Sequence, residues 1–170
     1  MGSDDAQRLE ALWNAHQRQV HAYALRRTDP ASADDVLAET FAVAWRRLRD
    51  VPDDALPFLL GTARRVLANQ RRGDQRRGAL TDRLQAGAAA QAPALADGTL
   101  AIALGRLPQT DRELLLLVAW EGLSATEAAR VVGCATAAVH VRLHRARRRL
   151  ARALAEQQPP ASEASMEVNS

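Results

Sequence analysis

The sequence contains no lysine, so all 23 of its basic side chains are arginines. Aromatic residues make up only 4% of the chain, so a core has to be built from leucine, valine and alanine, which favours helices over sheets. The single cysteine, Cys134, excludes an intramolecular disulfide and fits a reducing compartment. No apolar run approaches the roughly 20 residues of a membrane span, and the acidic N-terminus does not resemble a secretory signal. We therefore expect a cytoplasmic protein without membrane insertion.

The patterns of enzymes and metal sites are also missing. We find no Gly-rich phosphate loop, no paired catalytic carboxylates and no nucleophile beside a base. His140 and His144 have a spacing at which two histidines can share zinc on a helix, but no third ligand is evident. The sequence therefore predicts no enzymatic activity, no metal and no cofactor.

The charge of the chain is unevenly distributed. Residues 1–63 hold seven arginines and ten acids (−3), residues 64–83 hold seven arginines and two acids (+5), and residues 130–152 hold seven arginines and no acid (+7). Two basic segments on an otherwise acidic chain indicate two contacts with a polyanion. Guanidinium groups suit phosphates and guanine edges, although a coding bias toward arginine explains the missing lysine equally well.

The stretch from Leu123 to Leu154 has the pattern of a helix-turn-helix. Ser124 and Glu127 predict a capping box at the start of a short helix, and Gly133 suits the end of that helix. A longer helix then begins near Thr136, with an apolar stripe on one side and arginines on the rest of its surface. This arrangement is typical of binding in the DNA major groove. The alternative is a solvated, arginine-rich helix that closes a bundle.

Apolar residues at helical spacing predict five further helices. They are expected at about residues 5–27, 32–49, 58–72, 99–107 and 110–120. The acids of the second helix, Asp34, Asp35 and Glu39, lie opposite its apolar stripe. These acids either complement the helix dipole or form a docking face for a partner. The region between Gly73 and Gly98 is rich in Gly, Ala, Gln and Pro and is interpreted as a flexible linker.

Four stretches in this order resemble the extracytoplasmic-function group of bacterial sigma factors, the small two-domain branch of the sigma-70 family. Region 2.2 of the family resembles DDVLAETFAVAWRRL, and regions 2.3 and 2.4 resemble FLLGTARRVLANQRR. Regions 4.1 and 4.2 resemble LPQTDRELLLLVAWEGLSATEAARVVG followed by AAVHVRLHRARRRL. Together with the first helix, the resemblance covers about residues 5–154.

The resemblance implies an all-α fold of two small helical domains. A three-helix region 2 bundle (1–77) would bind core RNA polymerase and the −10 element, and a flexible linker (78–98) would follow it. A four-helix region 4 domain with the helix-turn-helix (99–155) would bind the −35 element, before a disordered tail (156–170). The resemblance implies a sigma factor that directs promoter-specific transcription initiation. Because its domains are expected to be loosely tethered, we expect the free protein to bind promoter DNA poorly.

The resemblance also assigns site residues. On the polymerase-binding face it places Asp35, Glu39 and Thr40, with Ala38 where the family usually carries Gln. For the −10 element it implies Arg64, Arg65, Asn69, Arg71 and Arg72, beside a pocket shaped by the loop 50–57. For the −35 element it implies Thr136, Ala137, His140, Val141, His144, Arg145 and Arg148. Arg145 is the best candidate for a bidentate guanine contact.

Two other functions fit parts of the sequence. A stand-alone helix-turn-helix regulator that does not enter the polymerase would explain the second domain but not the first. A helical adaptor whose basic faces bind acidic proteins would show no promoter-specific DNA binding. Many members of the resembled family are held by an anti-sigma partner, and the sequence does not identify one.

Overall fold

The computed structural model describes residues 2–81 and 98–157. Every regular element in these two ranges is helical, comprising seven α-helices and one short 3-10 helix, so the all-α prediction is confirmed. Most of the predicted linker and the tail beyond Gln157 lie outside the described residues. None of the described helices is long and apolar enough to cross a membrane.

The N-terminal bundle is formed by the elements that precede residue 82. It consists of α1 (Ser3–Leu25), α2 (Pro30–Arg46), η1 (Leu48–Asp50) and α3 (Leu56–Thr81). The three α-helices pack pairwise around a core in which Tyr23, Val36, Leu59 and Leu60 are fully buried. The segment 58–72 predicted for the third helix was too short at both ends. Residues 73–81 continue the helix beyond the packed region, where no apolar stripe marks its extent.

The start of α2 also differs from the prediction. The helix begins at Pro30 rather than near Ser32, because Asp29 acts as the N-cap and accepts a hydrogen bond from the Ser32 backbone nitrogen at 3.0 Å. Proline at the first helical position has the backbone angle that the helix requires. Hydrogen bonds from the Ser32 hydroxyl and backbone nitrogen lower the pKa of Asp29 below its ordinary value. The Thr28-Asp29-Pro30 sequence therefore starts a helix as well as ending one.

The C-terminal bundle contains the predicted helix-turn-helix. It consists of α4 (Gly98–Gly105), α5 (Gln109–Ala119), α6 (Ala125–Val132) and α7 (Thr136–Ala155). The capping box is confirmed, because Ser124 nitrogen donates to Glu127 Oε2 at 2.7 Å and Glu127 nitrogen donates to Ser124 Oγ at 3.2 Å. Gly133 follows α6 with φ of +76°, in the left-handed conformation that ends a helix. The other three helices all pack against α7.

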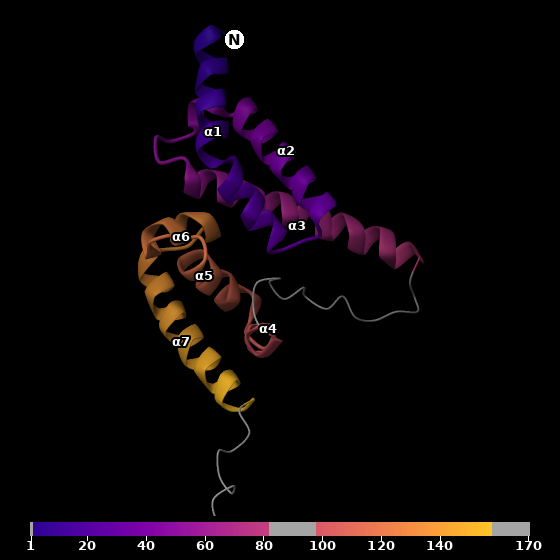
Figure 1. The fold of residues 1–170 in the computed structure, drawn as a ribbon, viewed down its shortest axis with the longest axis vertical. Coiled ribbons are helices and arrows are strands. Elements are labelled where there is room, and N and C mark those ends of the chain that lie inside the picture. Colours follow the sequence, from indigo (N-terminus) through magenta and orange to yellow (C-terminus); the bar gives the residue numbers. More distant parts are fainter. Residues whose placement is uncertain (1, 82–97, 158–170) are drawn as a thin grey trace, which may run out of the picture.

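The two bundles pack against each other. This differs from the prediction of two loosely tethered domains. Figure 1 shows α6 lying beside the N-terminal part of α3, and the buried apolar residues of both bundles form one continuous cluster. A Cβ atom at Gly61 of α3 would lie 3.6 Å from the Cα and the carbonyl oxygen of Val131 in α6. A side chain longer than alanine at residue 61 would therefore have to push α6 away. Residue 61 must therefore be small for the bundles to approach this closely.

Candidate nucleic-acid interface

The solvent face of α7 carries the residues predicted to read the −35 element. Val139, Leu143 and Ala146 are buried against the rest of the bundle, so the residues between them point outward. Thr136, at the first position of α7, is half-buried, and the remaining predicted residues are exposed. These exposed residues are Ala137, His140, Val141, His144, Arg145 and Arg148. The Val141 side chain is 51% exposed.

The arginines of this segment divide into free and paired groups. In the part of the chain that the structure describes, Arg142, Arg145 and Arg148 are exposed and form no ion pair. Arg149, by contrast, is paired with Asp111 of α5, and Arg130 of α6 is paired with Asp54 at 3.1 Å. The free guanidinium groups therefore remain available for phosphates or bases on one side of α7. Within residues 2–81 and 98–157, no cluster of three or more possible metal ligands occurs.

The residues predicted to contact the −10 element lie along α3. Arg65, Asn69, Arg71 and Arg72 are exposed, whereas Arg64 is half-buried. Asn69 Oδ1 accepts a hydrogen bond from Arg72, and Arg71 donates to the carbonyl oxygen of Arg27 at 3.0 Å. The predicted set is thus brought together on one helix, but Arg71 is partly engaged with α1.

A groove of about 820 Å³ runs between α2 and α3. Asp35 and Glu39 of α2, predicted to contact the polymerase, line one wall, and Arg65 and Asn69 of α3 line the other. The polymerase-binding site and the −10 site were predicted as separate sites, but residues of both line this groove. The acids lie on one wall, and the basic and polar residues Arg65 and Asn69 lie on the other. Ala38 also lines this groove.

Thr40 does not belong to this exposed face. Its side chain is fully buried, and its hydroxyl has no hydrogen-bond partner among the described residues. Thr40 follows Glu39 directly, and one residue along a helix turns the side chain by about 100°, here from the solvent side into the core. Thr40 is therefore placed in the core and not on the exposed face where the resemblance puts it, and its contact with the polymerase stays a prediction.

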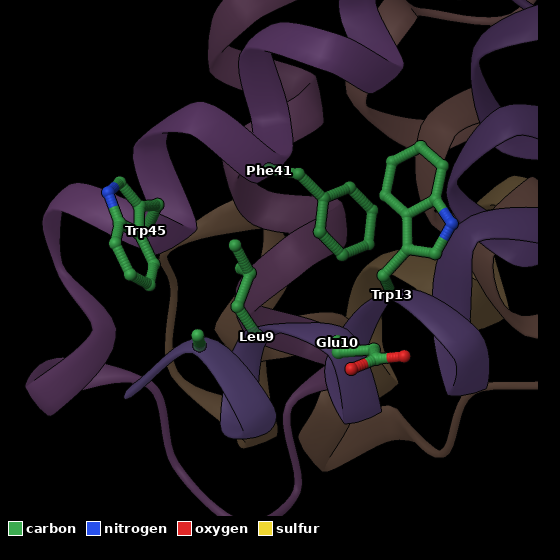
Figure 2. Close-up of a pocket in the computed structure, with 6 residues that line it drawn as sticks. Leu9, Glu10, Trp13, Phe41 and Trp45 are labelled. Carbon is green, nitrogen blue, oxygen red and sulfur yellow. The ribbon is translucent and has the colours of Figure 1, made fainter. Parts of the chain in front are cut away.

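A second, apolar pocket of about 300 Å³ lies between α1 and α2. Figure 2 shows Leu9, Trp13, Phe41 and Trp45 around it, with the Glu10 carboxylate at its edge. The Trp13 and Phe41 rings meet edge to face, with centroids 4.8 Å apart. The sequence predicted these apolar side chains as part of the helix-packing stripes, and they do join α1 to α2 while leaving Trp13 partly exposed.

A group of largely buried charged side chains lies where the two bundles meet, and the sequence did not indicate it. We call it the junction cluster: Tyr23, Arg26, Arg27, Glu113 and Glu121. Arg27 holds Glu113 with two hydrogen bonds, Nε to Oε2 at 3.1 Å and Nη2 to Oε1 at 3.2 Å. Arg26 binds Glu121 in the same bidentate manner, through Nε at 3.1 Å and through Nη2. The hydroxyl of Tyr23 donates to Glu113 Oε1 at 2.8 Å.

Burial determines the electrostatics of the junction cluster. Only 7% of the Arg27 side chain and 4% of the Glu121 side chain are exposed. Burial, together with the negative charge of Glu113, raises the pKa of Tyr23 well above its ordinary value. Burial alone would lower the pKa of Arg27, but Tyr23, Glu113 and Glu121 outweigh this effect and raise it. The cluster therefore keeps Arg27 charged and the Tyr23 phenol protonated.

Comparison with known families covers both bundles. The family model described as Sigma-70 region 2 matches residues 12–77, and the model described as Sigma-70, region 4 matches residues 100–150. The ECF RNA polymerase sigma factor SigL of Mycobacterium tuberculosis is 32% identical over 162 residues, which cover 89% of this chain and 92% of SigL. The ECF RNA polymerase sigma factor SigD of Mycobacterium bovis is 38% identical over 130 residues, which cover 70% of this chain and 61% of SigD.

The fold also matches a solved structure of the sigma factor RpoE from Bartonella quintana, in complex with the anti-sigma factor NepR. The TM-score is 0.68 at 23% identity, and the match covers 88% of this chain and 98% of that one. Its helices therefore follow the same overall arrangement. Two family models in sequence order, and a relative matched along nearly its whole length, show that the chain belongs to the sigma-70 family, in the extracytoplasmic-function branch of non-enzymatic transcription initiation factors.

Proposed function

We propose that this protein binds core RNA polymerase and directs it to promoters by contacting the −10 element with its N-terminal bundle and the −35 element with its C-terminal bundle. The observation that carries the proposal is the match of regions 2 and 4, in order, to the two bundles that bear the two basic segments. A stand-alone regulator would need only the C-terminal bundle and would leave the matched N-terminal bundle without a role.

The polymerase would dock at the groove between α2 and α3. The exposed carboxylates of Asp35 and Glu39 supply negative charge along one wall, which favours a basic partner surface. Among the described residues, Glu39 forms its ion pair with Arg46 of its own helix, at 2.9 Å and on the exposed surface. Such a pair contributes little stability, so Glu39 can exchange Arg46 for a partner at small cost.

Promoter recognition would use α7 and α3. The N-terminal half of α7 presents Arg145 with His140, Val141 and His144, which fits insertion of this helix in the major groove. Arg145 would make the bidentate guanine contact, while Arg148 would hold a phosphate. On α3, Arg64, Arg65, Asn69, Arg71 and Arg72 would hold the opened strand near the −10 element. Unstacking a base there costs about a few kcal/mol, which the bound polymerase helps to offset.

The partners of the protein would be core RNA polymerase, promoter DNA and an anti-sigma factor. The anti-sigma factor is proposed because the matched RpoE structure is a complex with one, NepR. Binding to polymerase would place the protein in the cytoplasm, associated with the nucleoid during initiation.

Run-off transcription with core RNA polymerase on a library of genomic promoter fragments tests the proposal. We expect specific transcripts only when the protein is added, and their start sites should share two sequence elements. A pull-down with core polymerase separates the alternatives, because a stand-alone regulator would form no complex. Specific promoter binding without any polymerase complex would therefore overturn the proposal.

A further inference from the structure

The junction cluster places two carboxylates of the C-terminal bundle in two arginine forks of the N-terminal bundle. Glu113 accepts two hydrogen bonds from Arg27, and Glu121 accepts two from Arg26. A guanidinium group binds carboxylates and phosphates with the same planar, bidentate geometry. The two forks are therefore shaped to bind an oxyanion, and in this conformation they bind the protein's own acids.

The forks are close to the basic surface of α3. Arg71 donates to the backbone carbonyl oxygen of Arg27 at 3.0 Å, so the Arg71 guanidinium group lies next to the Arg27 backbone. Arg64 of α3 is near enough to Tyr23 for its charge to influence the Tyr23 pKa. Without the two glutamates, Arg26 and Arg27 would extend the row of arginines on α3 toward the end of α1, forming one continuous positive surface.

The packed arrangement does not allow both promoter elements to be bound together. The −10 and −35 elements are about 25 base pairs apart, or roughly 85 Å at 3.4 Å per base pair. Two touching bundles of this size, each about 30 Å across, span only about 60 Å. The bundles must therefore separate, and separation uncovers the two forks. Much of the attraction in a buried ion pair is offset by desolvation of its charges, so the ion pairs of the junction cluster add only modestly to the cost of separation.

We propose that Arg26 and Arg27 form a phosphate-binding site for promoter DNA that Glu113 and Glu121 occupy while the bundles are packed. The two glutamates compete with the phosphates of the nucleic-acid backbone for Arg26 and Arg27. When the bundles separate, two phosphates replace the two carboxylates. This inference rests on the proposed function, since it adds backbone contacts to the DNA surface of the N-terminal bundle.

The test uses an opened variant of the full chain that carries Gly61→Gln, Glu113→Gln and Glu121→Gln. The first change pushes α6 from α3, and the other two remove the competing charges while keeping the side-chain shape. In this background, Arg26→Gln with Arg27→Gln is compared with a matched pair on α1 outside the cluster, Arg8→Gln with Arg18→Gln. The small-angle scattering radius of gyration reports opening, and circular dichroism confirms that each variant is folded.

Binding is measured by fluorescence anisotropy with a short single-stranded DNA of mixed sequence over a range of salt concentrations. We expect the opened variant to be larger than the wild type, to bind more tightly and to have a salt slope steeper by about 1.4, from two contacts of about 0.7 each. Loss of Arg26 and Arg27 should remove this increment, whereas the matched pair should retain most of it. Equal binding by the two arginine-depleted proteins, or an opened variant no larger than wild type, would overturn the proposal. Failure of the sigma function would instead appear as absent polymerase binding.

Discussion

Arg149 of α7 donates a hydrogen bond to Asp111 of α5, and this pair joins the last turns of α7 to the rest of the C-terminal bundle. Asp111 is buried, while about half of the Arg149 side chain is exposed. Arg148, its neighbour, is exposed and has no ion pair in the described part of the chain. Two adjacent arginines on one helix therefore have different roles, one in packing and one at the surface.

Replacing each of these arginines with glutamine should separate the two roles. Arg148→Gln should lower DNA affinity and reduce the salt slope on duplex DNA by about 0.9, since one phosphate contact is lost, with little change in melting temperature. Arg149→Gln should lower the melting temperature, because it leaves the Asp111 carboxylate buried without its partner. Thermal unfolding and DNA titration of both variants provide the measurements. An equal change in DNA affinity for Arg148→Gln and Arg149→Gln would contradict this division between a surface role and a packing role.

Arg145→Ala should lower transcription from the cognate promoter while leaving polymerase binding intact. A lost bidentate base contact is worth about 1–3 kcal/mol of discrimination, so promoter-specific affinity should fall by about one to two orders of magnitude. Run-off transcription and a polymerase pull-down are measured in parallel. Arg106→Ala is the control, because Arg106 forms only an exposed ion pair with Glu156 within the same bundle. Equal loss of transcription and polymerase binding in Arg145→Ala would refute the assigned role.

Charge reversal at Asp35 and Glu39 should weaken binding to core polymerase, since both line the groove proposed for docking. Asp34→Lys is a suitable control on the same helix, because the Asp34 carboxylate lies 2.9 Å from His21 Nε2 of α1 rather than in the groove. Affinity for fluorescently labelled core polymerase can be measured for each variant. If the variant with both charges reversed binds core polymerase with unchanged affinity, the groove is not the docking site.

The capping box of α6 should contribute a pH-dependent term to stability. Hydrogen bonds with Ser124, from its hydroxyl and its backbone nitrogen, lower the pKa of Glu127 below its ordinary value of 4.5. The ionised carboxylate therefore stabilises the fold above pH 4.5, and this contribution is lost as the pH falls through the lowered pKa. Denaturant unfolding of wild type and Glu127→Gln should show a difference at neutral pH that shrinks below that point. A stability difference between the two proteins that does not change with pH would contradict the role assigned to the ionised Glu127 carboxylate.

Local signals were enough to predict the helices and the helix-turn-helix. The capping box at Ser124 and the left-handed Gly133 lie within one short segment, and their geometry depends on neighbours in the chain. The ends of α3 were harder to predict, because its last turns extend beyond the bundle and need no apolar stripe. Thr40 was assigned to a surface by the resemblance, although its place on α2 puts it in the apolar stripe.

The contacts between the bundles could not be predicted in the same way. Arg27 and Glu113 are 86 residues apart, and neither position has a spacing that links it to the other. Their pairing depends on how α3 and α6 pack, which in turn requires a small residue at position 61. A surface arginine and a buried arginine look the same in a sequence of this composition, so only tertiary structure distinguishes them.

The sole tyrosine of the chain lies inside the junction cluster, with the Arg27 guanidinium carbon 3.6 Å from its ring centroid. As long as the bundles remain packed, phenolate formation at Tyr23 is suppressed above the ordinary pKa of 10.0. Separation would take the charge and the hydrogen bond of Glu113 away from the phenol and let it ionise at lower pH. The protein thus carries its own optical probe: phenolate absorbance in an alkaline titration reports, without any label, what fraction of molecules has come apart.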